Sequence, residues 1–163
     1  LKLPRGLQQD FSQHVQQATD SDGKEMTHHA LWQLFRTRYG LQAQPALTLL
    51  DYQSASQQDG QLSLQATLRH HGETRRLQGQ GNGLLSAAAS GLSALFRQPF
   101  MIKDYHEHTL GARSDSRSVA YIRCVFPQGE SYWGVGIDND VARASLQALC
   151  NALSAADQAG GRK

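Results

Sequence analysis

The chain has 163 residues and a formal net charge of +2, with 39% hydrophobic and 18% charged residues. This length suffices for one domain with a small appendage, and the composition excludes a disordered or fibrous protein. No apolar run approaches the ~20 residues of a membrane-spanning helix, and the basic residues are dispersed. We therefore expect neither a membrane nor a nucleic acid as a partner.

The chain opens with Leu1 in place of an initiator methionine, and the first residues lack the features of a signal peptide. We expect a piece cut from a longer cytoplasmic polypeptide. Cys124 and Cys150 stand in no spacing typical of a zinc site, which favours two reduced, buried thiols.

The first predicted element is a short amphipathic helix near the N-terminus. Pro4 suits a first helical position, and Leu7, Phe11 and Val15 recur at four-residue spacing, which makes one apolar stripe. The polar run at residues 20–23 predicts the turn that ends this helix.

A second helix is predicted between Thr27, a good N-cap, and Gly40, which suits the left-handed position after a helix. Leu31, Leu34 and Phe35 fall on one face. Two short helices with one apolar stripe each must pack on something else.

From residue 47 the hydrophobic period changes to two. Strands are predicted over Leu47–Tyr52 and Leu62–Leu68, where apolar and polar residues alternate strictly in the second. A polar third strand over Glu73–Gln78 leads through glycine-rich residues 79–83 into a helix. The residues expected on the inner side of this helix are Leu84, Leu85, Ala88, Leu92, Leu95 and Phe96.

The same order of elements recurs after Pro99. Strands are predicted over Met101–Leu110, Val119–Phe126 and Ser131–Ile137, and a last helix follows. The residues expected on the inner side of this helix are Val141, Ala144, Ser145, Ala148, Leu149 and Ala152.

The two halves match residue to residue. Gly79 and Gly81 align with Gly134 and Gly136 at an offset of 55, and the two helices align at an offset of 57, with two residues inserted in the second loop. This weak repeat predicts an α+β fold built on an internal duplication of a βββα unit. Each unit leaves one sheet face uncovered, so we expect a homodimer.

The glycine-rich start of the first unit's helix is a candidate binding segment. Glycines let the backbone approach a ligand, and free N–H groups at a helix start attract a carboxylate or phosphate. A dinucleotide site is disfavoured because the third glycine and the parallel βαβ unit are missing. The simpler alternative is that the glycines serve tight turns and close helix-to-sheet packing.

Histidines and nucleophiles give no positive case for catalysis. His106 and His108 would share one face of a strand as a possible metal pair. The adjacent pairs at 28–29 and 70–71 are expected to diverge in direction, and no third ligand stands at a recognised spacing. We find no activated nucleophile or carboxylate pair, and expect no catalytic residue, no metal site and no cofactor.

Together, five ordered segments resemble the regulatory domain of 2-isopropylmalate synthases. They are residues 79–83, 104–108, 120–121, 133–136 and 144–148. Residues 3–5, 10–12 and 31–35 similarly resemble the helical linker that joins the catalytic part of such enzymes to this domain. We therefore expect a helical linker subdomain over residues 1–43, made of two helices, and a regulatory (βββα)2 domain over residues 44–163.

The resemblance implies that leucine, a feedback inhibitor, binds between the two βββα units near the dimer interface. The parent enzyme would carry a separate TIM barrel that condenses acetyl-CoA with 2-oxoisovalerate at a divalent metal, and nothing in this chain matches that barrel. The implied partners are leucine, a second copy and the barrel. The leucine-binding residues implied by the resemblance are Gly81, Asn82, Gly83, Leu85, Ser86, Ile102, Tyr105, Thr109 and Val141.

Several alternatives stay open at this point. By hydrophobicity alone, Leu85, Ile102 and Val141 would be ordinary core residues. In a regular strand Ile102 and Tyr105 face apart, unless a bulge intervenes or they line different ends of the pocket. The chain would alternatively be an isoleucine-responsive regulatory domain of a citramalate synthase, a dimerisation module without ligand response or, most remotely, a small metalloenzyme.

Overall fold

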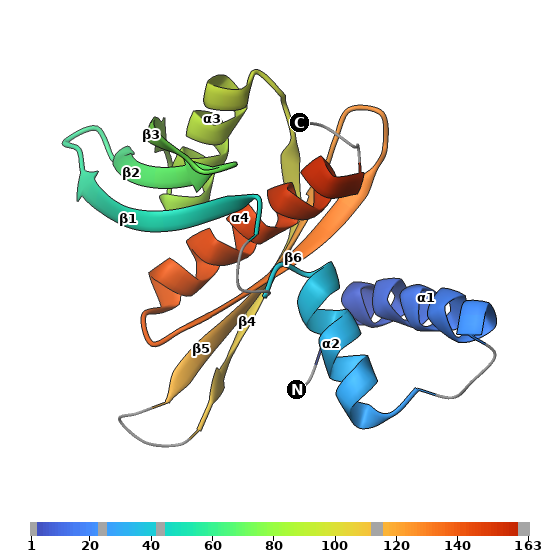
Figure 1. The fold of residues 1–163 in the computed structure, drawn as a ribbon. Coiled ribbons are helices and arrows are strands. Elements are labelled where there is room, and N and C mark those ends of the chain that lie inside the picture. The colour runs from blue at the N-terminus through green and yellow to red at the C-terminus, as the bar shows by residue number, and fades with distance from the viewer. Residues whose placement is uncertain (1–2, 23–25, 42–44, 112–115, 160–163) are drawn as a thin grey trace.

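The structure, a computed structural model, describes residues 3–22, 26–41, 45–111 and 116–159, and within these ranges it contains four helices and six strands (Figure 1). The strands form two three-stranded antiparallel sheets, β1-β2-β3 and β4-β5-β6, which confirms the predicted duplication of a βββα unit after two helices. The elements are α1 (Arg5–Asp22), α2 (His28–Arg38), β1 (Leu47–Ser56), β2 (Leu62–His70), β3 (Glu73–Gly81), α3 (Leu84–Phe96), β4 (Met101–Leu110), β5 (Arg117–Val125), β6 (Ser131–Asp138) and α4 (Val141–Ala159).

The predicted ends of α2 are confirmed. The Thr27 side chain accepts a hydrogen bond from the backbone N–H of Ala30 at 3.1 Å, and Gly40 follows the helix with a φ of 83°. A φ in this range suits glycine, because it has no β-carbon to clash with the backbone. Of the turn predicted at residues 20–23, the first residues belong to α1, and residue 23 lies outside the described ranges.

The first sheet extends further than its hydrophobic pattern predicts. Leu64, Ala66 and Leu68 of β2 are buried, as their alternation requires. However, β1 continues to Ser56 and β3 to Gly81, where both strands pair with Leu62. Backbone hydrogen bonds continue along residues whose side chains are polar, so a hydrophobic pattern alone underestimates strand length.

Glycines set the distance between helix and sheet in both units. A β-carbon added to Gly79 would overlap the carbonyl oxygen of Ala87, and one added to Gly136 would overlap that of Ala144. Both pairs are related by an offset of 57, so Gly79 is equivalent to Gly136. The offset of 55 that the sequence suggested for the glycines is therefore wrong by two residues. The two-residue insertion proposed between these glycines and α4 does not exist.

Helix α4 joins the two units. It packs on β5 and β6 of its own unit and also on β1 of the other, while α3 packs on β2 and β3. At one end of α4, Ser154 accepts a hydrogen bond from the backbone N–H of Leu47 at 2.9 Å. At the other end, Arg143 donates to the carbonyl oxygen of Leu50 at 2.8 Å. Figure 1 shows α4 lying between the two sheets, and one apolar cluster runs through both units.

Helices α1 and α2 cover the outer face of the second sheet. They form one apolar cluster with β5 and β6, whose buried members are Leu7, Phe35, Tyr39, Val119, Tyr121, Trp133 and Val135. The carbonyl oxygen of Tyr39 accepts a hydrogen bond from the N–H of Val135 at 3.2 Å. The Tyr39 hydroxyl donates to Asp10 at 2.6 Å. The second sheet is thus enclosed between α4 and the N-terminal helices, while the division into subdomains at residue 43 stays a prediction.

No helix within the described ranges has the length and apolar character needed to cross a membrane. Cys124 and Cys150 are free and buried, as predicted. Burial raises the pKa of both thiols to about 12, so both are protonated at neutral pH and lack the thiolate that reacts.

We predict that replacing Gly136 with alanine lowers the free energy of unfolding by about 1–3 kcal/mol, because the α4 backbone must move to admit the methyl group. Urea unfolding followed by circular dichroism measures the change. Gly83→Ala is the matched control, since a β-carbon at Gly83 meets no atom within 4 Å. An equal effect of the two substitutions would contradict the close contact between α4 and β6.

We also predict that neither cysteine reacts with a thiol reagent such as a disulfide-exchange dye in the folded protein at neutral pH. Both should react at once in denaturant, because unfolding exposes them and restores an ordinary thiol pKa. The absorbance of the released dye measures the number of reactive thiols. Rapid labelling of either thiol in the native state would show that the core around α4 opens readily.

Candidate functional site

The start of α3 carries no side-chain cap. Gly83 is the N-cap residue, in extended conformation, and makes no side-chain hydrogen bond to the helix. The first backbone N–H groups of a helix have no partner within the helix, and they carry a partial positive charge. The preceding Asn82 is held by Gln61, whose side-chain amide donates to its oxygen at 2.9 Å.

Gly81 and Ser86 lie against each other at this helix start. A β-carbon on Gly81 would lie 2.5 Å from the Ser86 hydroxyl and 2.7 Å from the backbone nitrogen of Ala87. The close packing that we considered as the simpler role of the glycines therefore holds at Gly81. Leu85 is half-buried against the main apolar cluster. Five of the residues implied by the resemblance, residues 81–83, 85 and 86, thus lie together at one helix start.

A bulge in β4 brings Ile102 and Tyr105 onto one face of the strand. The strand register shifts between Ile102 and Asp104, so that Ile102 pairs with Cys124 and Tyr105 pairs with Ile122. Cys124 and Ile122 both belong to the main core, and strand residues two apart share a face. The bulge therefore explains how Ile102 and Tyr105 share a face although their spacing in a regular strand would point them apart. Thr109 lies on the same face.

The β4 residues are linked to the start of α4. The Tyr105 hydroxyl lies 2.8 Å from the Ser145 hydroxyl, which donates to the carbonyl oxygen of Val141 at 2.9 Å. The Tyr105 hydroxyl also lies 2.7 Å from a Glu107 carboxylate oxygen, which is the alternative acceptor for its single hydrogen. Burial raises the pKa of Tyr105, and the Glu107 carboxylate adds to the rise, so the phenol stays protonated and can donate.

The surface formed by β4 and the start of α4 is open. Tyr105 is 39% exposed and Val141 is 43% exposed, so the prediction that Val141 faces inward is wrong for this chain by itself. Helix α4 covers β1 of the first unit, but among the described residues α3 makes no comparable contact with β4. Within the second sheet, β4 is thus the strand that no helix of the described residues covers to a comparable extent.

The start of α4 differs from that of α3 in carrying its own carboxylates. At the offset of 57, Gly81 corresponds to Asp138 and Gly83 to Asp140. Asp140 accepts hydrogen bonds from the Ala142 N–H at 3.0 Å and from the Tyr52 hydroxyl at 2.7 Å. The Tyr52 hydrogen bond is the main cause of a lowered pKa at Asp140, and it raises the pKa of Tyr52 to about 12. Sequence reasoning missed both residues, and the corrected offset is the signal that reveals Asp140.

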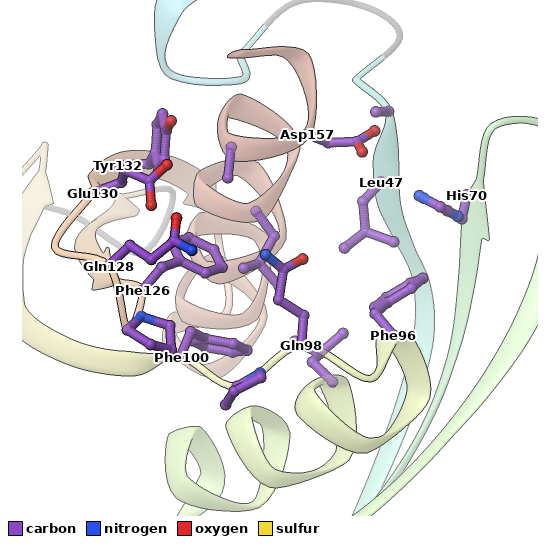
Figure 2. Close-up of a pocket in the computed structure, with 16 residues that line it drawn as sticks. Leu47, His70, Phe96, Gln98, Phe100, Phe126, Gln128, Glu130, Tyr132 and Asp157 are labelled. Carbon is purple, nitrogen blue, oxygen red and sulfur yellow. The ribbon is translucent and has the colours of Figure 1, made fainter. Parts of the chain in front are cut away.

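A cavity lined by described residues lies elsewhere (Figure 2). It has a volume of about 440 Å³ and lies between the two units, near the far ends of α3 and α4. Residues such as Leu47, Phe96, Phe126 and Leu153 line it. None of the nine residues implied by the resemblance lines this cavity, so in the described chain the α3 start and the β4 face form separate parts of a surface.

The histidines are placed only partly as predicted. His108 contacts the Tyr121 hydroxyl at 3.5 Å, and no described third ligand joins His106 and His108. The expectation that adjacent histidines diverge is wrong for His70 and His71, whose ring centroids lie 4.3 Å apart. The left-handed backbone at His71 is the reason, because side chains alternate only in extended backbone.

Comparison with known proteins gives one family. The model of the LeuA allosteric (dimerisation) domain matches residues 25–156. The chain is 44% identical to the 2-isopropylmalate synthase of Marinomonas sp. (strain MWYL1), covering 93% of this chain and 27% of that protein. It is 37% identical to that of Rhodospirillum rubrum, covering 97% and 29%, and 35% identical to that of Thermobifida fusca, covering 97% and 27%. The chain therefore spans less than a third of the length of these curated relatives.

We predict that Tyr52→Phe raises the pKa of Asp140 toward the ordinary value of about 3.9, because the phenol no longer donates to the carboxylate. A lowered native pKa stabilises the fold above the ordinary carboxyl range, and that contribution is lost as the pH falls through the native pKa. Carbon-detected NMR titration of the Asp140 carboxyl measures the shift. Tyr132→Phe, far from Asp140, is the control; equal titration curves for Tyr52→Phe and the unmodified chain would contradict the assignment.

Proposed function

Because this chain belongs to the family of LeuA allosteric (dimerisation) domains, we propose that it is the regulatory part of a 2-isopropylmalate synthase, and that it binds leucine as a feedback inhibitor in a homodimer. The condensation of acetyl-CoA with 2-oxoisovalerate at a divalent metal belongs to a separate catalytic barrel of the parent chain. This part of the chain carries out no catalysis.

The contrast between the two helix starts is the observation that carries the proposal. Asp140 caps α4 with a carboxylate of the chain itself, whereas Gly83, its equivalent, leaves the start of α3 without a side-chain cap. A free amino acid brings a carboxylate, and backbone N–H groups at a helix start are suitable donors for it. The first unit thus keeps open the position that the second unit fills with its own side chain.

The β4 face supplies the apolar contacts for the ligand side chain. Ile102 and Tyr105 share this face because of the bulge, and the Tyr105–Ser145 hydrogen bond holds it against the start of α4, where Val141 is exposed. Contact of these residues with an isobutyl group contributes roughly 1.5–3 kcal/mol, the range for burying one leucine side chain. Shape then decides between leucine and its isomers.

A second copy of the chain completes the site. The contact of α4 with β1 is not matched by an equivalent contact of α3 with β4, so each chain has one uncovered β4 face. The α4–β1 contact therefore has no counterpart that covers β4. In a symmetric dimer, the same surface of a second chain can cover it. The exposed Tyr105 lies on this face. In a dimer that covers β4 in this way, a ligand near the interface would change the relative positions of the two chains.

The enclosed second sheet provides the path to the rest of the enzyme. On one face, Ile122 of β5 lies opposite Tyr105 of the proposed site. On the other, its neighbour Tyr121 packs with α1 and α2, the helices that resemble the linker. A change in the position of β4 would therefore move β5, and β5 packs directly against the linker helices α1 and α2. Leucine can shift this equilibrium only by the difference between its affinities for the two states.

We predict that calorimetric titration of the chain with leucine gives one bound ligand per chain, and that Gly83→Asp weakens binding by roughly a hundredfold or more, as expected for leaving a buried carboxylate beside a like charge. The substituted Asp copies Asp140, caps α3 and occupies the position of the ligand carboxylate. Ser12→Asp is the matched control, because it adds the same charge at an exposed position of α1, outside the proposed site.

The same titrations with isoleucine and valine separate the alternatives. Tightest binding of isoleucine would instead favour the regulatory domain of a citramalate synthase. A dimer seen by sedimentation whose melting temperature ignores all three amino acids would leave a dimerisation module without ligand response. Leucine binding that Gly83→Asp leaves unchanged would contradict the carboxylate position.

A further inference from the structure

Three side chains with metal-binding atoms meet at the cavity between the two units. One ligand atom each of His70, His71 and Asp157 lies within 4.8 Å of the other two. His71 Nε2 is 2.7 Å from Asp157 Oδ2. Figure 2 shows His70 and Asp157 pointing toward one another from β2 and α4, at one side of the cavity.

The turn between β2 and β3 explains why two adjacent histidines face the same way. His71 and Gly72 have positive φ values of 50° and 84°, as in the two-residue hairpin turn whose twist matches that of the strands. The N–H of His71 donates to the carbonyl oxygen of Ala46 at 3.0 Å, which fixes the turn over α4. Both imidazoles therefore lie on the side of Asp157.

His70 is held in place and is available as a ligand. Its ring packs against Phe96 with centroids 4.7 Å apart. Burial lowers the pKa of His70, and the neighbouring His71 adds to the effect. Neutral imidazole is the form that binds metal ions.

We propose that His70, His71 and Asp157 bind one divalent transition-metal ion of the zinc class. Two imidazole nitrogens and one carboxylate oxygen are a donor set that zinc accepts, with the fourth position left for water. Ligand atoms bound at 2.0–2.2 Å around a tetrahedral ion lie roughly 3.4 Å apart, so the three atoms need only small movements. The adjoining cavity of about 440 Å³ gives the ion an entry path and room for its water.

The proposed ion ties the two units together at the end opposite to the leucine site. His70 and His71 belong to the hairpin of the first unit, and Asp157 belongs to α4 of the second. None of the nine leucine-site residues takes part, so the two proposals stand independently. Binding of the ion to the folded chain raises its stability, because the unfolded chain does not hold the three groups together.

The experiment uses the untagged chain and Co²⁺, a spectroscopic substitute for Zn²⁺. We expect one Co²⁺ per chain with the strong visible absorption of a low-coordinate ion, displaced by Zn²⁺, and a higher melting temperature with saturating Zn²⁺. His71→Asn and Asp157→Asn should each weaken binding by roughly tenfold or more, the scale seen when a metal site loses a supporting group. Asparagine tolerates the left-handed backbone at position 71, and circular dichroism checks the fold of each variant.

The double substitution His106→Gln/His108→Gln is the matched control, since it removes two histidines of the same chain outside the cluster and should leave the Co²⁺ spectrum unchanged. Absence of stoichiometric Co²⁺ binding by the folded chain would overturn the proposal. Binding that persists in both cluster variants, or that disappears in the control, would assign the metal to other side chains and overturn it equally.

Discussion

The packing of backbone directly against backbone, where each helix crosses the last strand of its unit, determines the rest of the structure. Gly79 and Gly136 have no β-carbon, so the carbonyl oxygens of Ala87 and Ala144 come into contact with the strands. Each helix is thereby fixed relative to its sheet, and the short segment between strand and helix has a defined shape. The position of the α3 start, and of any group that binds there, follows from this contact.

The two units share this packing but differ in how their helices begin and in how their sheets are covered. The first unit ends its last strand in Gly-Asn-Gly and leaves its helix start uncapped, and the second ends in Asp-Asn-Asp and caps its own helix. The second sheet is also enclosed on both faces, by α4 and by the N-terminal helices. The first unit thus provides the open helix start, and the second provides the rigid link to the preceding segment.

Sequence reasoning predicted the features that depend on local periodicity. The order of elements, the duplication, the burial along β2 and the caps of α2 all followed from it. It left the bulge after Ile102 as one of two alternatives, and it failed at the left-handed His71, which turns its side chain to the same side as that of His70. The exposure of Val141 and the equivalence of Gly83 with Asp140 depend on packing between distant elements, which no local pattern records.

The site residues that came from the resemblance are a different case. They fall into two separate groups, one at the α3 start and one on β4 with the start of α4. The corrected offset and the bulge account for this placement, and only the three-dimensional arrangement supplies both. The contacts of α1 and α2 with β5 and β6 have one more consequence, for synthesis on the ribosome. These helices are synthesised before the strands that bury Leu7 and Phe35, which follow about eighty or more residues later. Non-local contacts of this kind slow folding, so the apolar faces of α1 and α2 stay exposed until β5 and β6 have been made.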